Sequence, residues 1–246
     1  MRIEEYSAMF ELEDRLWWYQ GMRAITASII DTELTGRTDL RFLDVGYGTG
    51  YSLSWLGDRY KALESFGVDV SMHAAPFWKL RDLHAVSVAS ADALPFGPGE
   101  FDVLTCFDVI YQLNEARAAA AISEIYRVLK PGGLLFIREP AYEWMRGSHD
   151  IAVATHHRYT RRELKSLLAR GGFDIRRATY ANTLLFGAAA AHRLISRLQG
   201  SEESDVRPVA GWLNTAFLTA LRLEARVLRS LTMPFGLSTI VLAKKQ

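Results

Sequence analysis

The sequence predicts an α/β fold in which helices flank a doubly wound, mostly parallel sheet of seven strands. Short apolar segments alternate with segments of helical periodicity between about residues 40 and 180, as expected for parallel strands joined by helices. A glycine-rich loop directly follows the first apolar segment, at a place where such sheets bind their ligands. The last apolar segment, residues 236–244, is predicted to be an antiparallel edge strand.

The length and the composition suit one such domain with additions. The chain has 246 residues, of which 49% are hydrophobic, so it can bury a sizeable core. Its 29 basic and 28 acidic side chains nearly balance, and this balance predicts no nucleic-acid partner. The one cysteine, Cys106, cannot form an intrachain disulfide, which fits a reducing compartment and a cytoplasmic location.

The sequence predicts no transmembrane segment. Its first residues lack the apolar run of a signal peptide. The longest apolar run, residues 184–191, is much shorter than the ~20 residues that span a bilayer. The protein is therefore expected to be soluble, or at most to lie on a membrane surface.

Residues 1–36 are predicted to form an N-terminal helical cap. Apolar side chains recur at three- and four-residue steps, which predicts helix over residues 3–34. Trp17 and Trp18 are adjacent and point in different directions on a helix, so one can enter the core while the other faces a pocket. Packing of both rings in the core is the alternative.

The first strand and its loop carry the most informative pattern. Residues 42–45 read as a buried strand, and the three glycines that follow at alternate positions let the backbone turn tightly and approach a ligand (Gly46, Gly48 and Gly50). A helix follows, and its free amide groups face that ligand. Asp44 would repel a pyrophosphate and favour a cationic ligand. The dinucleotide fingerprint would also need glycine at position 51, where this chain has tyrosine.

Regular alternation continues after this loop. Helices are predicted over residues 51–60, 71–83 and 115–129, and strands near residues 64–69, 85–89, 101–106 and 133–138. The alanine-rich third helix ends before Pro131, Gly132 and Gly133, which predict a turn into the next strand.

A polar and aromatic loop follows the fifth strand, at the edge of the sheet where such folds keep their chemistry. Thr160 then predicts a helix start, because Glu163 lies three residues later and completes a capping box. This helix ends at two glycines, and a sixth strand is predicted over residues 173–180.

Residues 182–235 are predicted to be a helical insertion before the last strand. Helices are predicted over residues 184–198 and 208–231. They either pack on the sheet or form a substrate cover or a dimer face. With the insertion and the N-terminal cap set apart, the core of this single domain comprises residues 37–181 and 236–246.

These motifs together resemble those of the class I S-adenosylmethionine-dependent methyltransferases. The pattern Asp44-x-Gly46-x-Gly48-x-Gly50 is similar to motif I of that family, and Asp69 ends the second strand where the family has an acidic residue. Residues 91–96, 101–108 and 129–137 continue the resemblance. Segments beyond residue 140 are similar to a widespread and largely uncharacterised bacterial subgroup of the family.

The resemblance implies S-adenosylmethionine as the cofactor and S-adenosylhomocysteine as its product. It implies that Asp69 holds the ribose hydroxyls and Asp92 the adenine amino group. The cofactor-binding residues that it implies are Tyr19, Arg23, Asp44, Gly46, Tyr47, Gly48, Gly50, Asp69, Val70, Met72, Ala91, Asp92, Ala93, Leu94, Phe107 and Asp108.

Methyl transfer requires a nucleophile held in line with the methyl group, and sometimes a base that takes its proton. Histidine suits that second task because its unperturbed pKa lies near neutrality, although a loop anchor is the commoner role for one histidine. The catalytic candidates are His149, His156 and His157. The candidates for aromatic walls of the acceptor site are Trp18, Tyr111, Tyr142 and Trp144. No cluster has zinc spacing, so no metal is expected.

The sequence therefore predicts a methyltransferase that acts on oxygen or nitrogen of a small-molecule acceptor, with carbon less favoured. A protein that binds the cofactor or its product without methyl transfer is an alternative. A nicotinamide-dependent oxidoreductase is a weaker one, because Asp44 and Tyr51 contradict the dinucleotide fingerprint. The sequence leaves a homodimer open.

Overall fold

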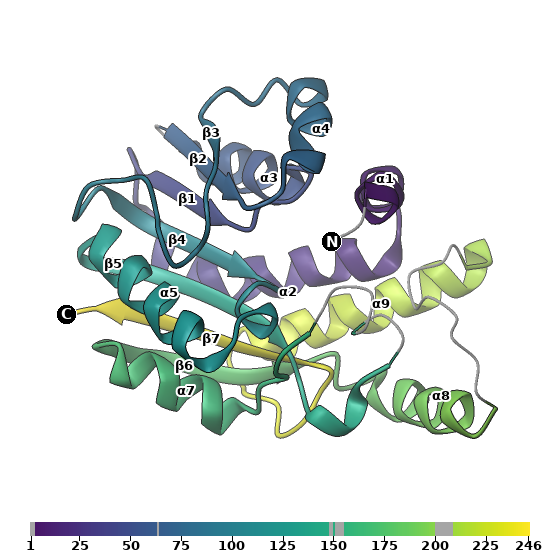
Figure 1. The fold of residues 1–246 in the computed structure, drawn as a ribbon. Helices are drawn as coiled ribbons and strands as arrows, with labels where there is room; N and C mark the ends of the chain where they lie inside the picture. The colour runs from purple at the N-terminus through teal and green to yellow at the C-terminus, as the bar shows by residue number, and fades with distance from the viewer. Residues whose placement is uncertain (1–2, 63, 148–149, 151–154, 200–208) are drawn as a thin grey trace.

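A computed structural model of the chain describes residues 3–62, 64–147, 150, 155–199 and 209–246. Its sheet has seven strands in the order β3-β2-β1-β4-β5-β7-β6 (Figure 1). The strands are β1 (Arg41–Val45), β2 (Glu64–Asp69), β3 (Val86–Val88), β4 (Phe101–Phe107), β5 (Leu129–Pro140), β6 (Phe173–Ala181) and β7 (Ser238–Lys245). The predicted α/β fold is confirmed.

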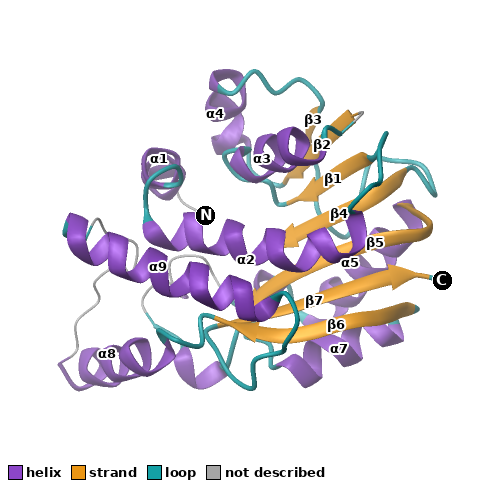
Figure 2. Ribbon diagram, turned by 180° about the vertical axis from the view of Figure 1, so that it is seen from behind, coloured by secondary structure: helices purple, strands orange, loops and turns teal. Residues whose placement is uncertain are grey.

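Helices cover both faces of the sheet (Figures 1 and 2). The α-helices are α1 (Ile3–Leu12), α2 (Trp17–Leu34), α3 (Tyr51–Tyr60), α4 (Ala75–Leu80), α5 (Glu115–Val128), α7 (Arg161–Arg170), α8 (Phe186–Gln199) and α9 (Gly211–Leu228). The described ranges also contain three short 3₁₀ helices: η1 (Met72–Ala74), η2 (Ile110–Gln112) and η3 (Glu143–Met145).

The core divides into two layers because alternate residues of each strand point to opposite faces. One layer packs Phe42 and Phe136 against α2, α3 and α9. The other packs the neighbouring residues Leu43 and Ile137 against α5 and α7. The near-continuous apolar sequence of the central strands follows from this burial on both faces.

The last strand is antiparallel, as predicted, but it is not an edge strand. β7 pairs with β5 on one side, for example Leu134 with Lys244, and with β6 on the other. β6 forms the edge instead. A strand that follows a long insertion can enter the sheet at any open position, and its own sequence does not show which.

The predicted N-terminal helix is two helices, α1 and α2, with a break at residues 13–16. Glu13, in this break, is buried and turns toward Thr49 of the glycine loop. α1 lies near α3 and α4 rather than continuing along α2 (Figure 1). The break therefore follows from a contact distant in sequence, which helical periodicity does not reveal.

β5 also begins earlier than predicted, at Leu129, so that Pro131, Gly132 and Gly133 lie within the strand. The pairing of β4 with β5 shifts register between Phe101 and Val103, which accommodates these residues as an irregularity instead of a turn. None of the described helices is long and apolar enough to cross a membrane.

Candidate functional site

The glycine loop after β1 has a backbone that only glycine adopts easily. Gly46, Gly48 and Gly50 have φ values of 77°, 54° and 87°. A Cβ atom on Gly46 would lie 2.1 Å from Val109 Cγ2, and one on Gly50 would lie 2.2 Å from Leu83 Cδ1. Gly50 is also the N-cap of α3 and provides no side-chain cap, so the first amide groups of the helix remain available to a ligand.

Asp44, at the end of β1, is buried and incompletely hydrogen-bonded. Its Oδ1 accepts a hydrogen bond from Thr105 Oγ1 at 2.7 Å, while its Oδ2 has no partner among the described residues. Burial raises the pKa of this carboxyl to about 7, although the Thr105 hydroxyl favours the charged form. An ammonium group of a ligand would provide the missing donor and would stabilise the ionised carboxylate.

Asp69, at the end of β2, faces the same loop. Its Oδ2 accepts a hydrogen bond from the Gly48 amide at 3.0 Å, and its Oδ1 accepts from the Ser71 amide at 2.9 Å. The Tyr6 hydroxyl of α1 also donates to Oδ1, at 3.3 Å. Burial raises the pKa of Asp69. Asp69 thus already accepts a hydroxyl group, as it would from a ribose.

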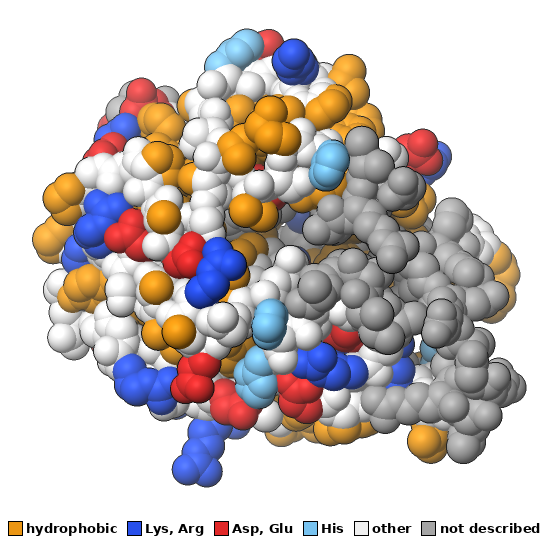
Figure 3. Space-filling view, in the orientation of Figure 1, with side chains coloured by type: hydrophobic (Ala, Val, Ile, Leu, Met, Phe, Trp, Pro, Cys, Tyr) orange, Lys and Arg blue, Asp and Glu red, His pale blue; other side chains and the backbone are white. Residues whose placement is uncertain are grey.

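The side chains that follow Asp69 leave an exposed apolar surface. Val70 is 71% exposed and Met72 is 65% exposed. Figure 3 shows hydrophobic side chains gathered over the part of the molecule formed by β3 and α4. A flat apolar ring such as adenine would cover such side chains.

Aromatic side chains enclose the glycine loop from the other side. The rings of Tyr47 and Trp78 lie 4.9 Å apart, and Trp78 Nε1 donates a hydrogen bond to the Gly48 carbonyl at 2.7 Å. The Tyr47 hydroxyl is buried without a hydrogen-bond partner among the described residues. Burial raises the pKa of Tyr47, so the group stays neutral. Tyr6, Tyr47 and Trp78 belong to one small buried cluster, called here the loop cluster.

The break between α1 and α2 fastens the N-terminal helices to this loop. Glu13 accepts a hydrogen bond from Thr49 Oγ1 at 2.6 Å and pairs with Arg81. Arg23 donates to the Glu13 carbonyl at 2.7 Å and lies 4.3 Å over the Tyr51 ring, at the first turn of α3. Arg23 is thus beside the glycine loop. Tyr19, the other residue predicted near the cofactor carboxylate, packs edge-on against Trp18, with their rings 5.0 Å apart.

The turn after β3 contains Asp92, the residue predicted to contact adenine. Arg117 Nε donates a hydrogen bond to Asp92 at 2.6 Å, and Ser90 also donates to this carboxylate. These hydrogen bonds lower the pKa of Asp92 to about 2. Ala91 and Leu94 are buried, and Ala93 forms a short backbone bridge with Ser90. An adenine amino group would therefore have to share Asp92 with Arg117.

The end of β4 carries an ion pair covered by aromatic rings. Asp108 has a φ of 57° and pairs with Arg138 of β5, whose Nε lies 3.1 Å from the Asp108 carboxylate. The Arg138 guanidinium lies 5.2 Å from the Trp18 ring and 4.8 Å from the Phe107 ring. Trp18, a predicted wall of the acceptor site, therefore covers this ion pair.

Glu139 fixes the segment that contains Tyr111. Its buried carboxylate accepts hydrogen bonds from the Ile110 amide at 2.9 Å and the Tyr111 amide at 3.1 Å. Burial raises the pKa of Glu139, and the carboxylate of Asp108 acts in the same direction. The Tyr111 carbonyl in turn accepts hydrogen bonds from the amides of His156 and His157, at 2.8 and 3.0 Å.

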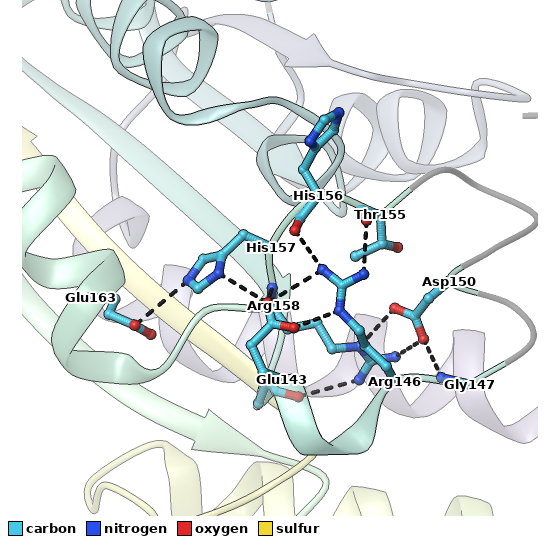
Figure 4. Close-up of polar contacts among 10 residues, drawn as sticks. Glu143, Arg146, Gly147, Asp150, Thr155, His156, His157, Arg158 and Glu163 are labelled. Atoms are coloured by element: carbon cyan, nitrogen blue, oxygen red, sulfur yellow. Dashed lines mark hydrogen bonds and ion pairs between the residues drawn. The ribbon is translucent and has the colours of Figure 1, made fainter. Parts of the chain in front are cut away.

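The two catalytic candidates that the structure describes, His156 and His157, have different surroundings (Figure 4). His157 Nδ1 lies 2.9 Å from Glu143 and its Nε2 lies 3.6 Å from Glu163, so carboxylates engage both ring nitrogens. His156 is exposed, and its ring has no hydrogen bond to a described residue. The third candidate, His149, lies outside the described residues.

Tyr142 and Trp144 join an aromatic cluster with Tyr180 and Phe186. The Tyr142 ring stacks 5.2 Å from Tyr180, and Trp144 lies 5.8 Å edge-on from Phe186. Trp144 is half exposed. Within the described ranges, no group of three or more His, Cys, Asp or Glu side chains could hold a metal ion.

Comparison with known proteins identifies this architecture. Residues 43–137 match a family model described as a methyltransferase domain. This central part of the chain is therefore similar to a methyltransferase domain. The match supports the predicted family, enzyme class and cofactor S-adenosylmethionine over these residues.

Two curated relatives are similar to part of this chain over part of their own length. The ubiquinone/menaquinone biosynthesis C-methyltransferase UbiE of Shewanella frigidimarina is 34% identical over 128 residues, which are 47% of this chain and 49% of that protein. The malonyl-[acyl-carrier protein] O-methyltransferase of Geobacter sulfurreducens is 31% identical over 151 residues, which are 54% and 55% of the two chains. This chain spans about half the length of the curated relatives it matches.

A solved structure has the same fold over nearly the whole chain. It comes from a complex between the Haloferax volcanii Trm112 methyltransferase activator and a methyltransferase. The match has a TM-score of 0.64 and 22% identity, and it covers 98% of this chain and 93% of the other.

The described residues of the methyltransferase domain fit S-adenosylmethionine at three points. Asp44 has an oxygen without a donor, as a methionine ammonium group requires. Asp69 can accept hydroxyl groups, and Val70 and Met72 offer apolar contact. The sulfonium charge of the cofactor also suits a site with two buried carboxyls.

The sequence did not reveal several residues of this site. Tyr6, Glu13 and Trp78 reach the glycine loop through contacts distant in sequence. Nothing in the spacing separates Glu13 from the adjacent Asp14. Glu139 could have been found from its position directly after an apolar segment. A carboxylate that is buried there must find hydrogen-bond donors.

Proposed function

We propose that this chain transfers the methyl group of S-adenosylmethionine to oxygen or nitrogen of a small-molecule acceptor, with carbon the less favoured target. The observation that carries this proposal is the buried Asp44 carboxyl, whose free oxygen lies next to the glycine loop. This arrangement favours a ligand with an ammonium group over a pyrophosphate, and so argues against a nicotinamide cofactor.

In this proposal Asp44 receives the methionine ammonium group and Asp69 receives the ribose hydroxyls. The Tyr6 hydroxyl must then release or share the Asp69 oxygen that it contacts at 3.3 Å. Arg23 of α2, which lies over the Tyr51 ring, would meet the methionine carboxylate. Val70 and Met72 would cover the adenine ring.

The acceptor would lie beyond the ends of β4 and β5, near Tyr111 and the loop that follows β5. Bound S-adenosylmethionine would supply an electrophilic methyl group. The acceptor oxygen or nitrogen would donate a lone pair to it, and the electrons of the broken carbon–sulfur bond would remain on sulfur. The proton of the acceptor goes to a base or to water. Alignment of the two groups and exclusion of water contribute most in such a step, up to ~7–11 kcal/mol.

His156 is the stronger candidate for the base among the described histidines, because carboxylates occupy both ring nitrogens of His157. His156→Ala should lower turnover by ~10²-fold or more and leave the affinity for S-adenosylhomocysteine unchanged. His192→Ala is a matched control, since His192 is an exposed histidine of α8. Equal turnover of the two variants would mean that alignment and desolvation act without His156.

The relatives support methyl transfer but leave the acceptor atom open, because the names of the two similar enzymes specify carbon in one case and oxygen in the other. The matched structural neighbour was solved with an activator protein, so a protein partner is a further proposal for this chain.

Calorimetric titration with S-adenosylhomocysteine and with NADH is the first test. Binding of the first and not of the second is expected, and the reverse would overturn the proposal. A screen of acceptors with methyl-labelled S-adenosylmethionine follows. Tight cofactor binding with no labelled product from any acceptor class would favour the alternative of a protein that binds the cofactor without transfer.

A further inference from the structure

Exposed apolar side chains are concentrated in the segment that separates β6 from β7. Eight of the thirteen large hydrophobic side chains exposed in the described part of the chain lie between residues 182 and 235. They are Leu184, Leu194, Ile195, Trp212, Leu223, Val227, Leu231 and Phe235. Contiguous exposed apolar surface on a folded chain marks a site of contact with another surface.

α9 contributes an ordered part of this surface. Its inward side, which includes Leu221 and Leu228, is buried against α2 and the sheet. Trp212, Leu223 and Val227 are 74%, 47% and 41% exposed. At 100° per residue, these three side chains fall within a narrow sector opposite the buried side. α9 is therefore apolar on both sides, unlike an ordinary surface helix, which is polar toward water.

Arginines border this outward apolar stripe on one side. Arg222, Arg226 and Arg229 are exposed, and their angular positions on the helix are next to one another. The one acidic residue of α9, Glu224, is buried on the other side and accepts a hydrogen bond from the Leu184 amide. The charged side chains on the outward face of α9 are therefore all positive, and its other exposed side chains are apolar or, at Thr215 and Thr219, uncharged.

Positive charge continues from α9 toward α2 and α3. Arg222 lines a surface hollow together with Arg23, Arg59 and Trp55. Asp31 pairs with Arg59 at 2.6 Å and neutralises that side chain, whereas Arg222 has no ion pair with a described residue. Figure 2 shows α2, α3 and α9 on the same side of the sheet, toward the viewer.

We propose that the outward face of α9 (Trp212, Leu223, Val227, Arg222, Arg226 and Arg229) binds the surface of a membrane that contains anionic lipids. Apolar side chains of such a helix enter the interface between headgroups and acyl chains, and the adjacent arginines meet the lipid phosphates. Tryptophan suits this depth because its ring is apolar and its N–H is polar. This binding is peripheral and goes beyond the proposed methyl transfer, on which it does not depend.

The positive charge of the α9 face favours an anionic lipid surface as its partner over a second copy of the chain. Two copies packed through the same face would bring their rows of arginines together, with no exposed acidic side chain of α9 to compensate. An anionic lipid surface provides the complementary charge along the whole row.

Sedimentation of the full chain with lipid vesicles tests the proposal. Vesicles of phosphatidylcholine mixed with phosphatidylglycerol should bind the chain at low salt, and high salt should weaken the binding. Phosphatidylcholine alone should bind it much more weakly. Arg222→Gln with Arg226→Gln should reduce binding by about thirtyfold, as expected for two cations near an anionic surface. Arg162→Gln with Arg170→Gln, on the exposed side of α7, is the matched control and should bind as the parent does.

A second readout keeps the proposal testable if a charge variant folds poorly. The tryptophan emission of the parent should shift to shorter wavelength when anionic vesicles are added, and Trp212→Phe should lose most of this shift. Equal binding to both kinds of vesicle, or no binding to either, would overturn the proposal. A concentration-dependent dimer in ultracentrifugation that Leu223→Ser with Val227→Ser abolishes would assign the face to self-association instead.

Discussion

Asp44 shows how a single buried carboxyl couples stability to pH. Its pKa in the folded chain is about 7, against about 3.9 for an unperturbed aspartate, so between these values the folded chain holds a proton that the unfolded chain has released. The protonated form therefore stabilises the fold, and this contribution is lost as pH rises through about 7. Asp44→Asn should melt at a higher temperature than the parent at alkaline pH and at a similar temperature at acidic pH.

Thermal unfolding over a series of pH values measures this difference. A constant offset between Asp44→Asn and the parent would contradict the assignment of the raised pKa to Asp44. The same variant should bind S-adenosylhomocysteine more weakly, because the amide cannot pair with the methionine ammonium group as a carboxylate does. Asp44→Asn would thus raise the melting temperature at alkaline pH and weaken the binding of S-adenosylhomocysteine.

Asp69 provides the second test at single-residue scale. Asp69→Ala removes a charged acceptor from the proposed ribose contact, which should cost about 1.5–3 kcal/mol of S-adenosylhomocysteine binding. Calorimetry measures this loss. Asp174→Ala, near the start of the edge strand β6, is the control and should bind as the parent does. Unchanged affinity in Asp69→Ala would place the ribose elsewhere.

Among the secondary-structure elements, α1 is the one whose position most affects the site. Tyr6 donates to Asp69, and a Cβ atom on Gly48 would lie 2.9 Å from Met9 Cε, so α1 lies directly over the glycine loop. If the Tyr6 hydroxyl competes with the ribose, Tyr6→Phe should strengthen S-adenosylhomocysteine binding by about two- to twelvefold, which is the net contribution of one hydrogen bond. Calorimetry distinguishes this from a supporting role of Tyr6, for which the affinity would fall.

The sequence predicted a helix or a turn well where interactions among neighbouring residues determine it. The capping box of Thr160 and Glu163 forms as predicted, because its four groups lie within one helical turn. The glycine loop has the positive φ values that its glycines allow. The break before α2 and the place of β7 in the sheet could not be predicted, because contacts with distant residues decide both.

At the scale of the whole molecule, the close packing of α2 on α9 joins the N-terminal cap to the proposed insertion. A Cβ atom on Gly21 would lie 2.2 Å from Leu221 Cδ1, so Gly21→Ala must displace one helix. We expect it to lower the free energy of unfolding by about 1–3 kcal/mol in denaturant titration. Gly187→Ala, on α8, has no atom within 4 Å of the added carbon and should leave stability unchanged or slightly raised. Similar effects of the two variants would contradict the packing of α2 on α9.

The topology of the sheet explains which residues of the site could be predicted from the sequence. Residues at the carboxyl ends of neighbouring parallel strands, such as Asp44, Asp69 and Asp108, come to one edge of the sheet by topology alone. The arginines that pair with carboxylates of the site could not be predicted from topology. Arg138 holds Asp108 and Arg117 holds Asp92, and each pair joins segments at least twenty-five residues apart.

The place of β7 has a consequence for how the chain is made. β6 hydrogen-bonds to β7 and has no other strand neighbour in the described sheet, while β5 lies on the far side of β7. During synthesis, residues 173–181 leave the ribosome well before residues 238–245, so β6 must wait with both of its edges unpaired. The nascent chain therefore carries a strand that is open to wrong partners until residues 238–245 are available to pair with it.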